Sequence, residues 1–486
     1  MSLTASQQDR AAGVLLGTAC GDALGAGYEF GPPLADDAIV VMKGGGGFGW
    51  APGEWTDDTS MAIPIAQAIA AGRDLQDEVV LDDIVARWVD WAKTAPDVGI
   101  QLRAVLGRTQ PTAAAIRVVA REHHDRHGRS AGNGSLMRTA PVALAYLDDP
   151  TTLATVARNV SALTHFEQDA GDACVLWCLA IRHAVLTGQL DVRIGLEAVP
   201  PERRALWVSR IETAEMFPPS HFTQNGWVVE AFQGAWSSTI ERVTVTCTGD
   251  VPADQLRQSL ERAVRGGRDT DTVAAIAGGL LGAGWGASAV PAEWRRIVHG
   301  SPGLSGAQLV RLGLQAAKHG VAGDGNWPAA EQFDYSGSGN ITELAQHPHD
   351  AGVWLGGVGN LDHLPAGVTA VVSLCRVGTE QVPAGLEHVE VWLIDAVDPA
   401  LNPNLDFVLR DTADAVAALR AEGHIVFLHC VQAISRTPTI AALYSARHLG
   451  IPIEKAIADV KRVLPLAHPN PAFVAALLPR YMDGSF

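Results

Sequence analysis

The stretch GVLLGTACGDALGAGYEF, Gly13 to Phe30, is representative of the helical sequence pattern in the N-terminal part of the chain. It is rich in Ala and Gly, which suits a tightly packed helix, and it carries two acids, Asp22 and Glu29. Outward from it, between Gln7 and about Ala317, apolar residues recur at spacings of three and four, the period of a helix. Val/Ile-rich alternation is nearly absent, so the sequence predicts an all-α N-terminal domain.

The overall composition fits a folded protein of two domains. A chain of 486 residues is too long for one ordinary core. Hydrophobic residues make up 47% and charged residues 18%, which argues against disorder. The net charge of −17 leaves no broad basic face for a phosphate backbone, so we expect no general nucleic-acid binding.

The sequence indicates a cytoplasmic protein. No charged segment followed by an apolar one opens the chain, and no uninterrupted apolar run reaches the ~18 residues of a spanning helix. We therefore expect neither secretion nor membrane insertion. The cysteines are sparse and form no CxxC pair, which fits a reducing compartment rather than a disulfide framework. They are Cys20, Cys174, Cys178, Cys247, Cys375 and Cys430.

The composition and the hydrophobic pattern of the sequence change in the C-terminal third. Residues 320–340, GVAGDGNWPAAEQFDYSGSGN, are rich in Gly, Ser and polar residues, as in a connector. Beyond them, β-type runs at 368–374, 389–394 and 424–429 alternate with helical segments. This alternation predicts a small α/β domain with a mainly parallel central sheet. The predicted divisions are an N-terminal domain over 1–325, a linker over 326–345 and a C-terminal domain over 346–486.

The segment VFLHCVQAISRTPTIAALY, Val426 to Tyr444, carries a reactive constellation. Cys430 follows a buried-looking strand and precedes a helix, and Arg436 lies six residues further on. A loop around a helix N-terminus points N–H groups at one spot, where they bind a phosphate dianion and lower the pKa of a thiol. The alternative is a buried cysteine with an unrelated arginine. The co-occurrence of strand, loop, Ser435–Arg436, Thr437 and helix favours a phosphate site.

Residues 350–486, with WLGGVGNL and VVSLCRVGTE, resemble the dual-specificity branch of the protein tyrosine phosphatase superfamily. The resemblance implies a phosphocysteine intermediate at Cys430. It also implies phosphoryl binding by Arg436 and the Ser435–Thr437 segment, with Thr437 assisting hydrolysis. The general acid comes from the loop after 389–394, where Asp395 is preferred to Asp398. One departure is Ala433, which occupies a position that is usually glycine in this family.

Two segments of the N-terminal part are dense in oxygen ligands. GEWTDDTSMAI and GGRDTDTVAAIAGG each place hydroxyls and carboxylates at the start of an Ala-rich helix. Helix capping explains either segment alone. Several acids at the starts of buried helices would repel one another unless a cation lay between them. The donor types suit Mg²⁺, Mn²⁺ or Ca²⁺ rather than zinc.

These two segments, together with GVLLGTACGDALGAGYEF, GNGSLMRTAPVAL and LTHFEQDAGDA, resemble the ADP-ribosylglycohydrolase family in content and order. The resemblance implies a catalytic or substrate-orienting role for Glu29. It implies binding of ADP-ribose by Asn133, Gly134, Ser135 and His165. It also implies two divalent cations, Mg²⁺ or Mn²⁺, and their expected ligands are Thr56, Asp57, Asp58, Asp269, Asp271 and Thr272.

Together the two resemblances predict a bifunctional hydrolase. One half is expected to cleave ADP-ribosyl N- or O-glycosidic bonds in a protein or small molecule, and the other to hydrolyse a phosphorylated substrate through cysteine. The alternative hypothesis makes the phosphatase-like domain a non-catalytic module that binds phosphate and targets the hydrolase. A third hypothesis, a reader of ADP-ribose without hydrolysis, is less favoured because all the expected ligand positions are filled.

Overall fold

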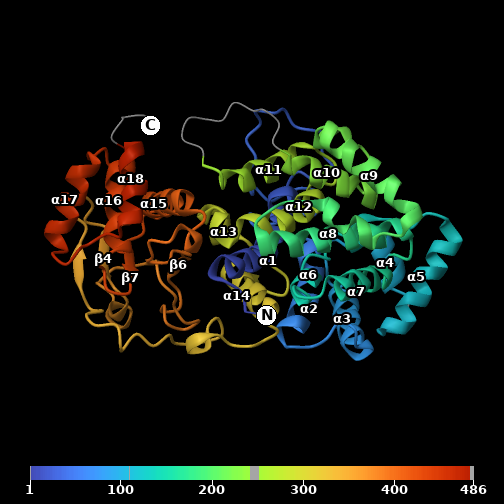
Figure 1. Cartoon of the computed structure of the whole chain (residues 1–486), viewed down its shortest axis with the longest axis horizontal. Coiled ribbons are helices and arrows are strands. Elements are labelled where there is room, and N and C mark those ends of the chain that lie inside the picture. Colours follow the sequence, from blue (N-terminus) through green and yellow to red (C-terminus); the bar gives the residue numbers. More distant parts are fainter. Residues whose placement is uncertain (1, 109, 241–250, 482–486) are drawn as a thin grey trace. The chain divides into compact units, whose positions relative to one another are not determined.

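The structure is a computed structural model that describes residues 2–108, 110–240 and 251–481 (Figure 1). The chain divides into two compact units. The first contains the described residues up to 240, Gln255–Val290 and Ile297–Val321. The second contains residues 251–254, Pro291–Arg296 and 322–481. Each unit is therefore built from more than one stretch of chain.

The first unit is helical, which confirms the prediction for the N-terminal part. α1 and α14 each begin at a capping box, formed by Thr4 with Gln7 and by Ser305 with Gln308. A short antiparallel pair, β1 (His299–Gly300) and β2 (Leu304–Ser305), precedes α14. The helices are α1 Ala5–Ala26, α2 Asp57–Ala70, α3 Glu78–Trp91, α4 Ile100–Leu106, α5 Ala113–His127, α6 Val142–Ala145, α7 Pro150–Ala162, α8 Gln168–Thr187, α9 Pro201–Met216, α10 Val228–Thr239, α11 Asp254–Arg265, α12 Thr270–Trp285 and α14 Gly306–Ala317.

Helices α1 and α12 pack backbone against backbone. A Cβ added to Gly17 would lie 2.2 Å from the carbonyl oxygen of Gly278, and one added to Gly21 would lie 2.0 Å from that of Ala274. Only glycine permits so close an approach. Gly13 and Gly25 meet α12 and the residues that follow it in the same way, one helical repeat to either side. The contact fixes the spacing between the acids of α1 and those at the start of α12.

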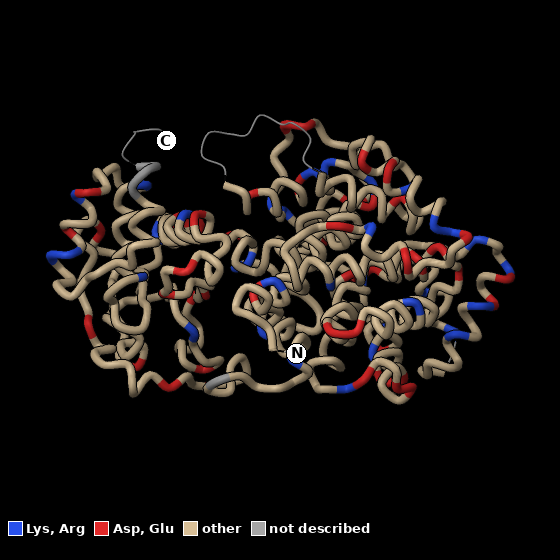
Figure 2. Tube along the Cα trace, viewed as in Figure 1, with Lys and Arg blue, Asp and Glu red and all other residues tan. Residues whose placement is uncertain are grey.

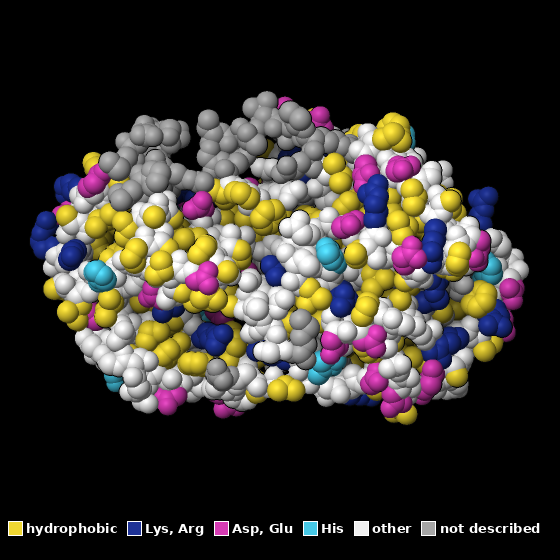
Figure 3. All heavy atoms as spheres, in the orientation of Figure 1, with side chains coloured by type: hydrophobic (Ala, Val, Ile, Leu, Met, Phe, Trp, Pro, Cys, Tyr) yellow, Lys and Arg dark blue, Asp and Glu magenta, His cyan; other side chains and the backbone are white. Residues whose placement is uncertain are grey.

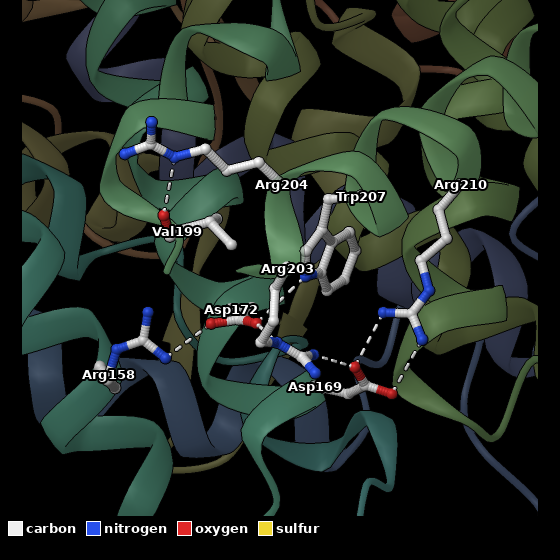
Figure 4. A network of polar contacts seen from close by, with 8 residues as sticks. All are labelled: Arg158, Asp169, Asp172, Val199, Arg203, Arg204, Trp207 and Arg210. Carbon is white, nitrogen blue, oxygen red and sulfur yellow. Dashed lines mark hydrogen bonds and ion pairs between the residues drawn. The ribbon is translucent and has the colours of Figure 1, made fainter. Parts of the chain in front are cut away.

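Ion pairs fix the beginning of α8 (Figure 4). The fully buried Asp172 accepts hydrogen bonds from Arg158 of α7, at 2.7 Å, and from Arg203 of α9. Asp169 is bound by Arg203 and, through both its oxygens, by Arg210 of α9 at 2.8 and 3.0 Å. The network joins α7, α8 and α9, and so holds both ends of the short loop between α7 and α8.

Helix α8 is the one described helix long and apolar enough to cross a membrane by length and composition. Its apolar window is 78% buried within the protein, as in a core helix. On the face shown in Figure 3, hydrophobic side chains lie in groups among polar ones, which is normal for a folded surface. Figure 2 shows acidic residues interspersed with basic ones along the helices of the first unit.

The second unit is built on a five-stranded sheet of order β3-β4-β7-β5-β6. β3 is antiparallel to β4, and the other neighbours pair in parallel, so the sheet is mixed. The strands are β3 Leu344–Gln346, β4 Val353–Gly357, β5 Ala370–Ser373, β6 Glu387–Glu390 and β7 Val426–Cys430. The helices are α13 Ala292–Ile297, α15 Leu405–Ala421, α16 Arg436–His448, α17 Ile453–Val463 and α18 Pro471–Tyr481. The sequence did not predict β3 or β4.

Alternate residues of the strands enter two apolar clusters. Val372, Leu428 and Cys430 lie in the larger one with residues of α15 and α16, whereas Val371 and Phe427 lie in the smaller one. The helix-bearing cluster also receives Ala292 of α13. The residues that follow Ala292 are anchored as well: Arg295 binds Asp411, and Arg296 binds Glu387 and Glu422.

Two sequence expectations differ from the structure in detail. The strand expected over 389–394 ends at Glu390, because the backbone N–H and C=O of Ile394 bind the side chain of Asn402 instead of a neighbouring strand. The stretch from 322 to 343 belongs to the second unit and makes defined contacts there. Tyr335 donates to the carbonyl of Arg376 at 2.7 Å, and Gln432 donates to the carbonyl of Ser338.

The cysteines of the described residues are free thiols, and all of them are buried. Cys247 lies outside the described residues.

Candidate active sites

Carboxylates from α1, α2 and α12 converge in the first unit. Oxygen atoms of Asp22, Asp58 and Asp271 lie within 4.8 Å of one another, and so do those of Glu29, Asp269 and Asp271. Asp271 belongs to both groups. The structure thus brings together acids that are more than 200 residues apart in the sequence.

The first group is oriented by the start of α2. Asp22 accepts hydrogen bonds from the backbone N–H groups of Thr56 and Thr59, at 2.9 and 3.0 Å, and from the Thr59 hydroxyl at 2.7 Å. Oδ2 of Asp58 accepts from the hydroxyls of Thr56 and Thr272, at 3.1 and 3.4 Å. These N–H groups are the unpaired donors of a helix start, which favours negative charge there.

Several oxygens of the cluster are left without a partner. Asp58 Oδ1, Asp271 Oδ1 and Glu29 Oε2 are buried and accept no hydrogen bond from any residue that the structure describes. Burial and then neighbouring carboxylates raise the pKa of Asp58, Asp271 and Glu29 above their usual values, that of Glu29 to about 9. Burial raises the pKa of Asp22 to about 6. Orphaned, mutually repelling oxygens of this kind fit hard divalent cations.

Asp57 faces a further acid, Asp97, that the sequence motifs do not contain. Burial raises the pKa of Asp57 well above its usual value, and the charge of Asp97 is the largest contribution from a neighbour. The pKa of Asp97 is itself raised, by burial and by Asp269. Asp97 is therefore part of the same electrostatic cluster, and it comes from the loop before α4.

The GNGS segment lies at the edge of this cluster. The amide of Asn133 donates to Oδ2 of Asp269, at 2.7 Å, and to the carbonyl of Asn225 at 2.9 Å. A Cβ added to Gly134 would lie 3.2 to 3.3 Å from the ring of His165, so the glycine permits that ring to approach. Ser135 is buried and accepts from Ser161 at 2.9 Å, inside the fold.

In the second unit, Cys430 ends β7 and Arg436 begins α16. The Cys430 side chain is 2% exposed. Nη1 of Arg436 donates to the carbonyls of Leu374 and Leu393, at 2.7 and 3.2 Å. The Nε atom of Arg436 and the hydroxyl of Thr437 are buried without a hydrogen-bond partner in the described part of the chain. Both are side-chain donors in the first turn of α16.

The two candidate acids differ in position. Asp395 accepts from the hydroxyl of Ser435 at 2.8 Å, and its Oδ2 lies 3.8 Å from Arg436 Nε. Asp398 caps the short helix Pro399–Leu401 through the N–H of Ala400, at 2.9 Å. Asp395 thus contacts the Cys430–Arg436 loop, whereas Asp398 binds its own segment.

Ala433 adopts the left-handed backbone conformation, with φ of +58°. This is the conformation that glycine accepts freely at such a turn. An alanine there is strained by about 1 to 2 kcal/mol. The loop forms in this structure despite the side chain, and the strain is stored within it.

Sequence reasoning missed Asp97 and Asn225 as members of the first cluster, and it singled out Asp22 without placing it among the metal ligands. Asp97 and Asn225 stand in loops without a recognisable pattern, and Asn225 acts by binding Asp269: its Oδ1 accepts from the backbone N–H of that residue, at 3.3 Å. Asp22 was visible as an acid within the small-residue part of α1. A buried acid among alanines and glycines is itself a signal, because it needs partners.

Comparison with known proteins agrees with this geometry in the first unit. Residues 3–323 match the sequence model of ADP-ribosylglycohydrolase. The chain is 30% identical over 297 residues to the ADP-ribosyl-[dinitrogen reductase] glycohydrolase of Rhodospirillum rubrum, which covers 60% of this chain and 90% of that protein. It is 29% identical over 300 residues to the ADP-ribosylarginine hydrolase Tri1 of Pseudomonas putida (strain GB-1), covering 59% and 73%.

A solved structure of human DUSP28 is similar to the C-terminal part, at 25% identity and a TM-score of 0.26 over 29% of this chain and 94% of that chain.

The matched region, residues 3–323, contains every carboxylate of the cluster and the GNGS segment. The family predicted for the N-terminal part from its motifs is therefore confirmed. The chain belongs to the ADP-ribosylglycohydrolase family.

Proposed function

We propose that the first unit removes ADP-ribose from an N- or O-glycosidic linkage with the help of two divalent cations, Mg²⁺ or Mn²⁺. The observation that carries this proposal is the set of buried, partnerless oxygens on Asp58, Asp271 and Glu29. The two overlapping acid groups, which share Asp271, offer two cation positions. The proposed ligands are Thr56, Asp57, Asp58, Asp269, Asp271 and Thr272.

Cations held there supply Lewis-acid polarisation of the substrate's hydroxyls and of water. The residues of the chain supply the rest. Asn133 is tied to Asp269 and so holds the GNGS segment against the cluster. Glu29 holds a proton at neutral pH in the metal-free protein, because burial and its acidic neighbours raise its pKa to about 9. Its carboxyl group orients the nucleophile or the sugar once the charges of the cluster are balanced.

The substrate class is proposed from the relatives, whose names specify ADP-ribosylated dinitrogen reductase and ADP-ribosylarginine. The test is release of ADP-ribose from peptides modified on arginine or serine, with Mn²⁺, with Mg²⁺ and after chelation. Asp58→Asn is expected to abolish release. The matched control is Asp9→Asn, which alters a buried aspartate of α1 that caps Ser288, at 2.9 Å, away from the cluster. Equal activity of the two variants would refute the assignment.

We propose that the second unit is a cysteine-dependent phosphomonoesterase. The Cys430 thiolate attacks phosphorus, the bond from phosphorus to the leaving oxygen breaks, and Asp395 transfers a proton to that oxygen. Water then attacks the phosphocysteine and gives a proton to the Asp395 carboxylate, the sulfur–phosphorus bond breaks, and phosphate and the thiolate are released; Thr437 assists this step. The orphaned donors of Arg436 and Thr437 support this proposal, since they are unpaired where a phosphate would be bound.

The alternative is a phosphate-binding module that does not turn over, favoured by the strain at Ala433. Hydrolysis of an aryl phosphate by the wild type, lost in Cys430→Ser but not in Cys178→Ser, would exclude it. Saturable binding of inorganic phosphate without hydrolysis would establish it. A reducing, cytoplasmic compartment is part of the proposal, because the thiols of the described residues are free.

A further inference from the structure

The guanidinium of Arg138 is an uncommon buried cation. Its side chain is fully buried, and the nearest carboxylate influence on it among the described residues is the charge of Asp57. It lies over the ring of Trp88, 4.1 Å from the centroid. Its Nη2 donates a hydrogen bond to the hydroxyl of Thr164, at 2.6 Å. Burying a charge is costly, which favours a functional role for the hydrogen bond from Arg138 to Thr164.

The Thr164 hydroxyl also lies 2.8 Å from Nδ1 of His165. Arginine can only donate, so the threonine oxygen accepts from Arg138 and its own proton must go elsewhere. Among the described residues, the acceptor within reach is Nδ1 of His165. A neutral imidazole that accepts at Nδ1 carries its proton on Nε2. The relay from Arg138 through Thr164 therefore selects one tautomer of His165.

The environment of His165 favours an uncharged ring, as a single N–H on Nε2 requires. Burial, and then the positive charge of Arg138, lower the pKa of His165 well below its usual value. The neutral form of the ring is therefore favoured. A neutral ring has one N–H group, and the hydrogen-bond partner at Nδ1 determines which of the two ring nitrogens carries that proton.

The Nε2 atom faces the GNGS segment. A Cβ added to Gly132 would lie 3.4 Å from it, and one added to Gly134 would lie 3.3 Å away. Nε2 has no hydrogen-bond partner within residues 2–108, 110–240 and 251–481. Neither glycine has a side chain to fill the space beside Nε2, and the amide of the intervening Asn133 binds Asp269. The ring is 2% exposed, and the N–H group without a protein partner is the one we assign to an acceptor oxygen of a ligand.

The surrounding fold holds the relay still. The carbonyl of Thr164 accepts from the side chain of Gln101 at 3.1 Å. The loop between α7 and α8 that carries Thr164 and His165 is flanked by the ion-pair network of Asp169 and Asp172 (Figure 4). Rigid flanks keep the imidazole at one angle, as a positioned donor requires.

We propose that Arg138 is a positioning residue that acts through Thr164 to fix His165 as a neutral Nε2–H donor. The donor faces the glycine-lined segment and binds an oxygen of the ADP-ribose moiety. The ligand part of this inference rests on the proposed glycohydrolase function, whereas the tautomer does not. In this proposal Arg138 does not touch the substrate, and it meets the carboxylate cluster only through the charge of Asp57.

The test is nitrogen NMR of the full chain labelled with ¹⁵N-histidine, with His165 assigned by difference from His165→Gln. Long-range couplings distinguish an Nε2–H ring from an Nδ1–H or a charged ring. The wild type is expected to show a single Nε2–H form. Arg138→Met frees the threonine oxygen to accept from Nδ1, so the Nδ1–H form appears. Arg138→Lys keeps a donor and is expected to restore the wild-type form.

Thr164 provides a second pair of variants should position 138 not tolerate change. Thr164→Val removes the hydroxyl at constant shape and is expected to lose the single tautomer, whereas Thr164→Ser keeps it. Calorimetry with ADP-ribose should give about tenfold weaker binding for Thr164→Val, the equivalent of about 1.4 kcal/mol, and wild-type binding for Thr164→Ser. An Nδ1–H or charged ring in the wild type, or an unchanged tautomer in Thr164→Val, overturns the relay. If the tautomer behaves as expected but the wild type binds no ADP-ribose, the relay stands and the proposed function fails.

Discussion

Replacing Gly17 by alanine tests whether the contact between α1 and α12 sets the geometry of the acid cluster. The new Cβ would lie 2.2 Å from the carbonyl oxygen of Gly278, whereas ordinary contact begins at 3.4 Å. The obstructing atom belongs to the backbone, so the helices must separate by about 1 Å. Over-packing of this kind costs about 2 kcal/mol, which lowers Tm by roughly 3 °C in a unit of this size.

The same displacement reaches the site, because α1 carries Asp22 and α12 carries Asp271. A misplacement of about 1 Å reduces turnover by roughly 100-fold. Thermal unfolding and ADP-ribose release should be measured together. The control is Gly234→Ala in α10, whose Cβ would meet only the Val273 side chain at 3.4 Å; alanine there should change stability by no more than about 1 kcal/mol. Identical behaviour of the two variants would show that the glycine contact does not control the site.

Three further outcomes follow from the structure. In the metal-free protein, Glu29 keeps a proton up to about pH 9 that the unfolded chain releases near its ordinary pKa of 4.5; the folded state therefore binds more protons, and the free energy of unfolding falls as pH rises across that window. Adding Mn²⁺ should raise Tm, and by more at pH 8 than at pH 6, because the cation replaces protons; a shift independent of pH would count against a carboxylate site. Ala433→Gly relieves the left-handed strain and should stabilise the Cys430–Arg436 loop by about 1 kcal/mol, seen as a higher Tm and, if the proposed phosphate site is formed, as tighter phosphate protection of Cys430 against alkylation; a lower Tm would mean that the alanine is accommodated without strain. Neutralising the acid missing from the motifs, Asp97→Asn, should lower the pKa of Glu29 and weaken the pH dependence of Tm, and an unchanged profile would separate Asp97 from the cluster.

The sequence revealed groups whose chemistry is local to a short segment. Asp57 and Asp58 stand together at the start of one helix, and Cys430 and Arg436 flank a single loop, so each pair is visible in one line of sequence. What escaped prediction depends on contacts made across the fold. Asp97 can be assigned to the acid cluster only because it lies close enough to Asp57 to raise the pKa of that residue. Arg138 belongs to a residue type that is usually exposed, and only the structure shows that it is buried.

The connector illustrates the same limit. Its Gly and Ser content is typical of a linker, yet Tyr335 donates to the carbonyl of Arg376 and the segment lies within the second unit. Composition indicates how flexible the backbone of an isolated segment is. Hydrogen bonds to residues about 40 positions away decide whether that segment is ordered in the folded protein. The short antiparallel edge strand β3 was not predicted for a similar reason. It is defined by its pairing with β4 and not by an apolar run of its own.

Helix α13 gives the chain an order of assembly during synthesis. Arg296 leaves the ribosome long before its partner Glu422, which lies 126 residues further along. Between them the chain adds Ile297–Val321, which belongs to the first unit and includes α14. The first unit is therefore complete while the anchors of α13 still await the second unit's sheet and α15. Contacts of such long separation form slowly, so the second unit should be the last to mature on a nascent chain.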